Sequence, residues 1–117
     1  MKNNILWVDD EIELLESHII YLTDKGYNIL TANSGEDAIE LCKESKIDLI
    51  LLDEMMTGID GITTLKIIKG DYPDIPVIMV TKNEEEDFME EAIAEKISYY
   101  LTKPVNPSQI LMACKKL

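Results

Sequence analysis

The sequence contains no long apolar run. None of its hydrophobic segments approaches the roughly 20 residues that a membrane-spanning helix requires. The N-terminus, Met1 to Asn4, also lacks the apolar core of a signal peptide. We therefore expect a cytoplasmic chain without a membrane partner.

Cysteine and basic residues are also scarce. The two cysteines, Cys42 and Cys114, have neither a disulfide framework nor metal-ligand spacing, so we interpret both as reduced, small, buried hydrophobic residues. Only 11 Lys and Arg residues stand against 23 Asp and Glu, which gives a net charge of −12. Because this charge repels nucleic-acid phosphates, we expect no direct binding to nucleic acid.

Linkers, repeats and low-complexity segments are absent as well. A chain of 117 residues with 46% hydrophobic and 29% charged residues is typical of one soluble globular domain. We therefore expect a single domain over residues 1–117 and exclude a multidomain enzyme. The last amphipathic stretch reaches Leu117 without a Gly or Pro stop, so we expect this domain to be cut from a longer protein.

What the sequence does contain is a regular alternation of apolar runs and amphipathic stretches. The runs predict strands at 5–8, 27–32, 47–52, 77–80 and 97–101, and the stretches predict helices at 11–25, 34–45, 62–69, 84–95 and 107–117. The runs at 49–52 and 77–80 are apolar throughout, which is typical of parallel strands covered by helices on both faces. With short right-handed crossovers, this predicts an α/β fold: a doubly wound five-stranded parallel sheet of order 2-1-3-4-5, a flavodoxin-like (βα)5 arrangement.

Polar residues stand at the ends of four predicted strands. Asp9 and Asp10 follow the first strand, Asp53 follows the third, Thr81 follows the fourth and Lys103 comes just after the fifth. The ligand crevice of such a sheet lies beyond the carboxyl ends of its strands, so we expect these residues on one rim. Three neighbouring carboxylates repel one another unless a cation is bound. Oxygen ligands without nearby His or Cys favour Mg²⁺, with Mn²⁺ as an alternative, over Zn²⁺.

Together these side chains indicate phosphoryl transfer to a carboxylate. Asp53 would attack phosphorus to give an acyl phosphate, while the metal neutralises the developing charge. Lys103 would pair with the phosphoryl oxygens or with Asp53, and Thr81 would donate its hydroxyl to one of those oxygens. Each residue taken alone has an ordinary explanation: Asp9 and Asp10 as acids at a helix start, Lys103 as a solvated loop residue, Thr81 as a β-branched strand residue. Only the occurrence of all these residues at the strand ends favours phosphoryl transfer.

The sequence resembles the receiver domains of bacterial two-component response regulators over essentially its whole length. The resemblance is carried by the segments 5–11 (ILWVDDE), 51–61 (LLDEMMTGIDG) and 100–104 (YLTKP), together with Thr81. It implies that Asp53 is the phosphoacceptor. It also implies that Asp10 is a direct Mg²⁺ ligand, that Asp9 acts through a metal-bound water, and that the backbone carbonyl of Met55 is a further ligand.

The same resemblance implies a conformational switch. The Thr81 hydroxyl would move toward the phosphoryl group and the Tyr100 ring would turn inward, while Lys103 is the family's site lysine and its bond to Pro104 is cis. The surface that changes would comprise the helix 84–95, the strand 97–101 and the helix 107–117, which is an output face or a phosphorylation-dependent homodimer face.

The resemblance also implies partners. A sensor histidine kinase or a phosphotransfer protein would supply the phosphoryl group, and small phosphodonors can substitute. The domain would catalyse its own aspartyl phosphorylation and dephosphorylation without being a conventional enzyme.

Some positions depart from the family pattern. Thr57 replaces a usual proline, which should loosen the turn after Asp53. Lys82 replaces a usual small residue, and its bulk or charge is expected to alter access to the acyl phosphate. Met55 and Asn83 are variable positions that flank the site.

Three other functions compete with this interpretation. A flavodoxin-like cofactor binder needs a Gly- or Ser/Thr-rich phosphate loop after the first strand, where Asp9, Asp10 and Glu11 would repel a phosphate. A phosphatase-type aspartyl enzyme needs two acids separated by one intervening residue on the first strand, and a hydrolytic base downstream; neither is visible. A receiver that has lost phosphorylation and serves only as an interaction module is disfavoured by the intact set of site residues.

Overall fold

The apolar runs form one five-stranded parallel sheet. The computed structural model describes residues 3–54, 56, 58–82 and 85–117. Its strands are β1 (Asn4–Val8), β2 (Asn28–Ala32), β3 (Leu49–Leu52), β4 (Val77–Thr81) and β5 (Tyr99–Thr102), in the order β2-β1-β3-β4-β5. Every neighbouring pair is parallel. The predicted fold and strand order are confirmed.

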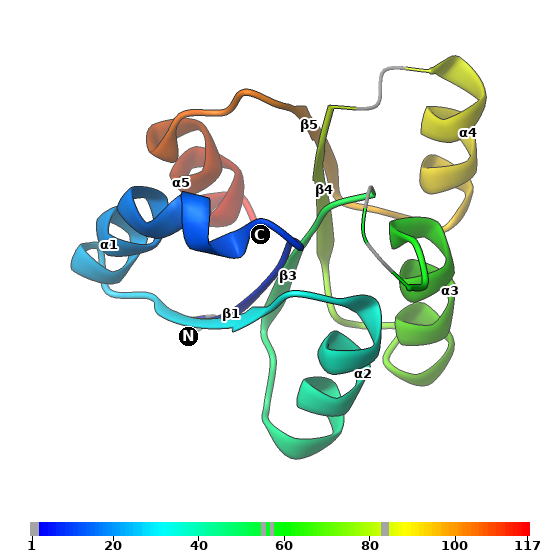
Figure 1. Ribbon diagram of the computed structural model, residues 1–117, viewed down its shortest axis with the longest axis horizontal. Coiled ribbons are helices and arrows are strands. Elements are labelled where there is room, and N and C mark those ends of the chain that lie inside the picture. The colour runs from blue at the N-terminus through cyan, green and yellow to red at the C-terminus, as the bar shows by residue number, and fades with distance from the viewer. Residues whose placement is uncertain (1–2, 55, 57, 83–84) are drawn as a thin grey trace.

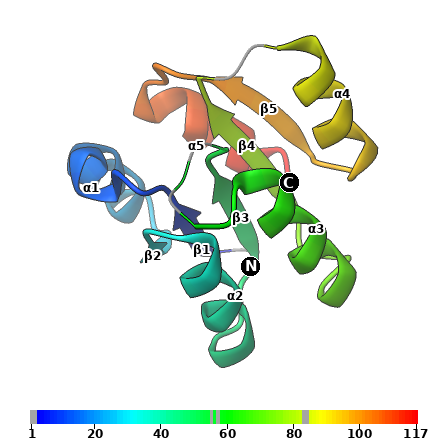
Figure 2. The ribbon, with the colours of Figure 1, turned by 45° about the vertical axis from the view of Figure 1, so that its right-hand side comes forward.

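Helices cover both faces of the sheet. They are the 3-10 helix η1 (Ile12–Leu15) and the α-helices α1 (Glu16–Asp24), α2 (Gly35–Glu44), α3 (Gly61–Asp71), α4 (Glu86–Ala94) and α5 (Pro107–Lys115). In Figure 1, α1 and α5 lie on one side of the sheet and α2, α3 and α4 on the other. The turned view in Figure 2 shows the same division. The chain is therefore a three-layer α/β structure.

The central strands send alternate side chains into two apolar cores. Leu6 of β1 and Ile50 of β3 face the core beneath α2, α3 and α4, whereas Trp7 and Leu51 face the core beneath α1 and α5. All four side chains are fully excluded from solvent. Because both faces are covered, these strands have no polar alternation.

Side-chain caps explain where three of the helices begin. The hydroxyl of Ser34 accepts the N–H of Asp37 at 3.1 Å at the start of α2, and Asp60 and Asn106 cap α3 and α5 in the same way. The predicted helix 11–25 instead begins as η1, and neither η1 nor α1 starts on a side-chain cap. The predicted helix 84–95 is observed as α4, and Glu84 lies outside the described residues.

Both cysteines are core residues, as the sequence predicts. Cys42 and Cys114 are free and buried, and burial raises the pKa of the Cys114 thiol to about 11. Both therefore act as small core residues. Within the described part of the chain, no helix has the length and apolarity needed to cross a bilayer.

Candidate functional site

Three carboxylates meet at the carboxyl ends of β1 and β3. One oxygen of each of Asp9, Asp10 and Asp53 lies within 4.8 Å of the others. The strand ladder fixes two of them, because the Asp9 N–H donates to the carbonyl of Ala32 and the Asp53 N–H to that of Val8, both at 3.0 Å. Asp9 is 1% exposed and Asp53 is 5% exposed. The predicted acidic cluster is therefore assembled, with two of its members almost fully buried.

Lys103 lies against this cluster. Its Nζ is 2.6 Å from Oδ2 of Asp9 and 3.3 Å from Oδ2 of Asp53. Its backbone N–H donates to the carbonyl of Thr81 at 2.8 Å, and its bond to Pro104 is cis, as the resemblance implied. Burial lowers the pKa of Lys103, but the hydrogen bond to Asp9 and the charges of both acids outweigh it, so the pKa lies above its ordinary value. Lys103 is therefore held as a cation.

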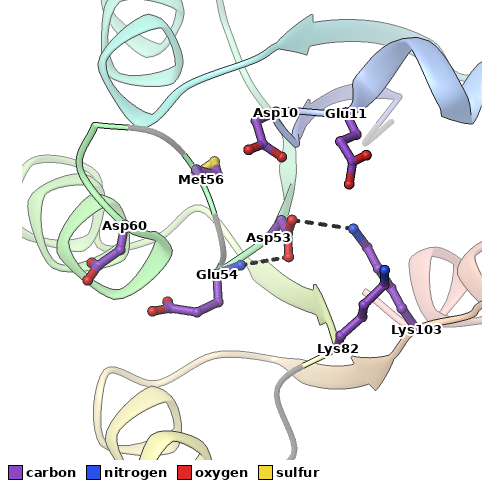
Figure 3. Close-up of a pocket in the computed structure, with 8 residues that line it drawn as sticks. All are labelled: Asp10, Glu11, Asp53, Glu54, Met56, Asp60, Lys82 and Lys103. Atoms are coloured by element: carbon purple, nitrogen blue, oxygen red, sulfur yellow. Dashed lines mark hydrogen bonds and ion pairs between the residues drawn. The ribbon is translucent and has the colours of Figure 1, made fainter.

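Asp53 is hydrogen-bonded through both oxygens. Oδ1 accepts the backbone N–H of Glu54 at 2.9 Å, and Oδ2 accepts from Lys103, as Figure 3 shows. Burial raises the pKa of Asp53 and the charge of Asp9 adds to this, while Lys103 opposes both; the net pKa is raised. The ionised cluster thus carries more negative charge than one ammonium can balance, which favours the uptake of a cation.

Thr81 and Tyr100 lie on the neighbouring strands β4 and β5. Thr81 is fully buried at the end of β4, next to the backbone of Lys103. Tyr100 is half-buried on the face of the sheet that α4 covers, and its ring meets Phe88 of α4 edge-on at 6.0 Å between centroids. Tyr99 points into the opposite core, with the Lys116 ammonium over its ring. The two predicted switch residues therefore lie on the two strands that follow β3 in the sheet, and Tyr100 contacts α4.

The sequence analysis missed the role of Glu54. Its Oε2 accepts the N–H of Ile62 at 3.0 Å, and its carbonyl accepts the N–H of Gly61 at 3.0 Å, so Glu54 holds the start of α3 against the end of β3. A Cβ on Gly61 would collide with the backbone of Asp53, so glycine is required there. The sequence signal was the pair Asp60-Gly61 before an apolar run, which marks a helix start.

Burial also changes the acidity of Glu54. It raises the pKa of this carboxyl to about 7; the hydrogen bond from Ile62 opposes the shift, and the charges of Asp60, Asp53 and Glu91 add to it. Glu54 therefore titrates near neutral pH in the metal-free chain.

An open pocket of about 590 Å³ lies over the cluster. Figure 3 shows its lining, which contributes five carboxylates, two ammonium groups and a thioether: Asp10, Glu11, Asp53, Glu54, Met56, Asp60, Lys82 and Lys103. The donors near the cluster are oxygen atoms, the set that Mg²⁺ prefers. The residues present therefore fit a hard divalent cation together with a phosphoryl group.

Some site expectations lie outside the described residues. These are the backbone carbonyl of Met55 as a metal ligand, the effect of Thr57 on the turn and the position of Asn83. Lys82, the other departure from the family pattern, is described and lines the pocket.

Comparison with known proteins supports the same family over nearly the whole chain. Residues 5–115 match the Response regulator receiver domain family. The chain is 40% identical over 103 residues to the transcriptional regulatory protein ZraR of Escherichia coli strain K12, which covers 88% of this chain and 23% of ZraR. It is 38% identical over 112 residues to the transcriptional regulatory protein YvrH of Bacillus subtilis, covering 94% of this chain and 47% of YvrH. The chain thus spans less than half the length of either relative.

A solved structure of a response regulator shares this fold. The response regulator protein TrrA of Thermotoga maritima, solved in complex with Mg²⁺-BeF, matches with a TM-score of 0.86 at 30% identity, covering 97% of both chains.

Proposed function

This chain belongs to the receiver-domain family of two-component response regulators, and we propose that it acts as a switch by accepting a phosphoryl group on Asp53. Receiver domains of this family are phosphorylation-dependent switches. The observation that supports Asp53 is its place beside Asp9 and Asp10, with the Lys103 ammonium within 3.3 Å of its carboxylate.

In the transfer step the Asp53 carboxylate reacts directly with the phosphodonor. A carboxylate oxygen of Asp53 forms a bond to phosphorus, and the bond from phosphorus to the donor breaks. With a phosphohistidine the departing imidazole keeps the electron pair and takes up a proton; with acetyl phosphate the leaving group is acetate. Lys103 remains charged throughout and pairs with the phosphoryl oxygens.

Asp9, Asp10, Asp53 and the Met55 carbonyl would hold Mg²⁺ at this rim, with Mn²⁺ as the alternative. When bound, the metal supplies positive charge that offsets the carboxylates and the charge developing on the phosphoryl oxygens. The chemistry of the donor set and the closeness of the three aspartates support this assignment.

Thr81, Tyr100 and the surface of α4, β5 and α5 would carry the response. The Thr81 hydroxyl would bond the phosphoryl group and the Tyr100 ring, packed on Phe88, would follow. A phosphorylation-dependent homodimer through this surface, and a histidine kinase or phosphotransfer protein as donor, belong to the same proposal. So does the assignment of residues 1–117 as the receiver part of a longer, cytoplasmic regulator.

Intact mass spectrometry after incubation with Mg²⁺ and acetyl phosphate tests the proposal. We expect one phosphoryl mass increment in the wild-type chain, none when EDTA replaces Mg²⁺, and none in Asp53→Ala with Mg²⁺ present. Circular dichroism of the variant checks that the fold is kept. An unchanged increment in folded Asp53→Ala would remove Asp53 from the role of acceptor.

A further inference from the structure

Lys82 is the second ammonium group that lines the phosphoryl pocket. It follows Thr81 at the end of β4 and borders the pocket together with Asp53 and Lys103. Figure 3 shows the side chains of Lys82 and Lys103 extending into the pocket from the ends of β4 and β5. Lys82 is exposed, so its ammonium is accessible to a molecule that arrives from bulk solvent.

The two lysines differ in their partners. Lys103 is only 17% exposed in its side chain and is paired with Asp9 and Asp53. Lys82 forms no ion pair or hydrogen bond with any of the residues that the structure describes. Among the described residues nothing neutralises its positive charge, which can therefore act on an incoming anion.

The Lys82 ammonium lies in a strongly acidic environment. The pocket lining carries five carboxylates, and the whole chain has a net charge of −12, so an anionic phosphodonor is repelled as it approaches. The exposed Lys82 ammonium at the pocket offsets this repulsion locally. Its attraction is twice as large for a dianion as for a monoanion, and salt weakens it.

We propose that Lys82 captures the phosphodonor and makes the receiver selective for donors that carry two net negative charges, a role that rests on the transfer to Asp53 proposed above. Lys82 draws the donor's phosphoryl oxygens into the pocket before the Asp53 oxygen attacks. The bonds that form and break are unchanged: with acetyl phosphate, phosphorus bonds to Asp53 and acetate leaves with the electron pair. Lys82 thus attracts the phosphodonor as it binds, whereas Lys103 pairs with the phosphoryl group during its transfer.

Three variants separate the charge of Lys82 from its bulk. Lys82→Met keeps most of the length and the apolar stem without the charge, and Lys82→Arg keeps the charge. Lys46→Met is the matched control, because Lys46 is an exposed lysine that precedes β3, at the opposite end of the strands from the pocket. It makes the net charge more negative by the same amount.

The measurement is the second-order labelling rate by intact mass, with saturating Mg²⁺, at low and at high salt. Two donors are compared: acetyl phosphate, a dianion at neutral pH, and phosphoramidate, which carries one net negative charge. At low salt we expect Lys82→Met to slow labelling by acetyl phosphate roughly three- to tenfold and labelling by phosphoramidate clearly less. The difference should vanish at high salt, while Lys82→Arg and Lys46→Met label like the wild type.

Other results would overturn the role of Lys82. Equal rates in Lys82→Met and Lys46→Met would show that the charge does not matter, and a faster Lys82→Met would show that the side chain obstructs the pocket. Losses of equal size for both donors at every salt concentration would indicate a structural effect. Absence of labelling in the wild-type chain would refute the proposed function, and this inference with it.

Discussion

Lys103 balances two buried carboxylates in the metal-free chain. Asp9 and Asp53 are almost completely removed from water, and the Lys103 Nζ lies within 3.3 Å of both. Removing one member of a buried ionic cluster usually costs more than the pair contributes, because the remaining charges lose their partner.

We expect Lys103→Met to lower the free energy of unfolding by about 1–3 kcal/mol when divalent cations are absent. The measurement is urea denaturation with EDTA and again with Mg²⁺. Because a bound divalent cation would replace the missing positive charge, the loss should shrink with Mg²⁺. Equal denaturation midpoints for Lys103→Met and the control Lys46→Met under both conditions would contradict this account.

Glu54 gives the chain a pH dependence of stability. Its pKa of about 7 in the folded chain lies above the ordinary value of 4.5, so the fold favours the protonated carboxyl. The stability that protonation confers is complete below about pH 4.5 and is lost as the pH rises through 7.

Glu54→Gln should therefore flatten the decline of stability across this pH window. The amide keeps an oxygen that can accept the N–H of Ile62 but has no charge to bury. With EDTA present we expect the wild type to lose about 1–2 kcal/mol more than the variant between the two pH limits; the partial solvation of the carboxylate keeps the loss below the full shift. Denaturant midpoints measured at several pH values test this, and parallel pH profiles for the two proteins would contradict it.

At the scale of elements, Gly35 sets how closely α2 and α3 pack. It is the first residue of α2, and a Cβ there would collide with Thr64 of α3 and with Ile59 in the loop before it. Ile59 directly precedes the Asp60 cap of α3, so this packing also supports the site. The close approach is possible because glycine has no side chain.

Gly35→Ala and Gly70→Ala make a matched pair. We expect Gly35→Ala to destabilise the fold by about 1–3 kcal/mol through overpacking. Gly70 is a helical residue at which an added Cβ would meet no atom within 4 Å apart from the backbone of its own helix and its chain neighbours, so Gly70→Ala should stabilise the chain by about 0.4–1 kcal/mol. Thermal or urea unfolding measures the stability of both variants. Equal changes of the same sign would show that the close contact between α2 and α3 at Gly35 does not limit the size of the side chain there.

Across the whole molecule, acidic residues outnumber basic ones to give a net charge of −12, and three of the aspartates converge at one rim. A cation that binds only the folded chain stabilises it by mass action. General screening of negative charge by salt would also stabilise the chain, so the two effects must be separated.

We expect Mg²⁺ to raise the thermal midpoint of the wild-type chain well beyond NaCl of equal ionic strength. Stabilisation by a bound ion reaches about 2.7 kcal/mol when its concentration is a hundredfold above its dissociation constant. Asp10→Asn should lose most of this response because it removes one carboxylate of the cluster while leaving the buried pair of Asp9 and Lys103 intact. An equal rise of the thermal midpoint with Mg²⁺ in Asp10→Asn and the wild type would contradict binding of the ion at this cluster.

Most of the fold was predictable from the sequence because strands and helices follow local periodicity. The continuous run at Leu49–Leu52 identified a strand buried on both faces, and the amphipathic stretch from residue 34 identified α2. The predicted start of the first helix at residue 11 was less accurate, because the chain first forms η1 and α1 begins only at Glu16. No side-chain cap specifies where the regular helix begins. The gathering of Asp9, Asp10 and Asp53 was also predictable, because parallel strands end at one rim.

Individual side-chain hydrogen bonds between different elements were not predictable. His18 is half-buried and its Nε2 donates to the carbonyl of Val105 at 2.7 Å, a contact that no pattern in the sequence indicates. The link between Glu54 and Ile62 and the raised pKa of Glu54 were equally invisible. Such features depend on how the helices and loops pack.

The sequence by itself determined the parallel sheet, its order and the set of acids at its rim, because strand order and rim chemistry follow from short-range patterns and from the handedness of the crossovers. Only the tertiary structure decided which oxygens Lys103 contacts, how deeply Asp9 and Asp53 are buried and where Glu54 anchors α3. Those properties depend on distance and on exclusion of water, and both are set when distant segments come together.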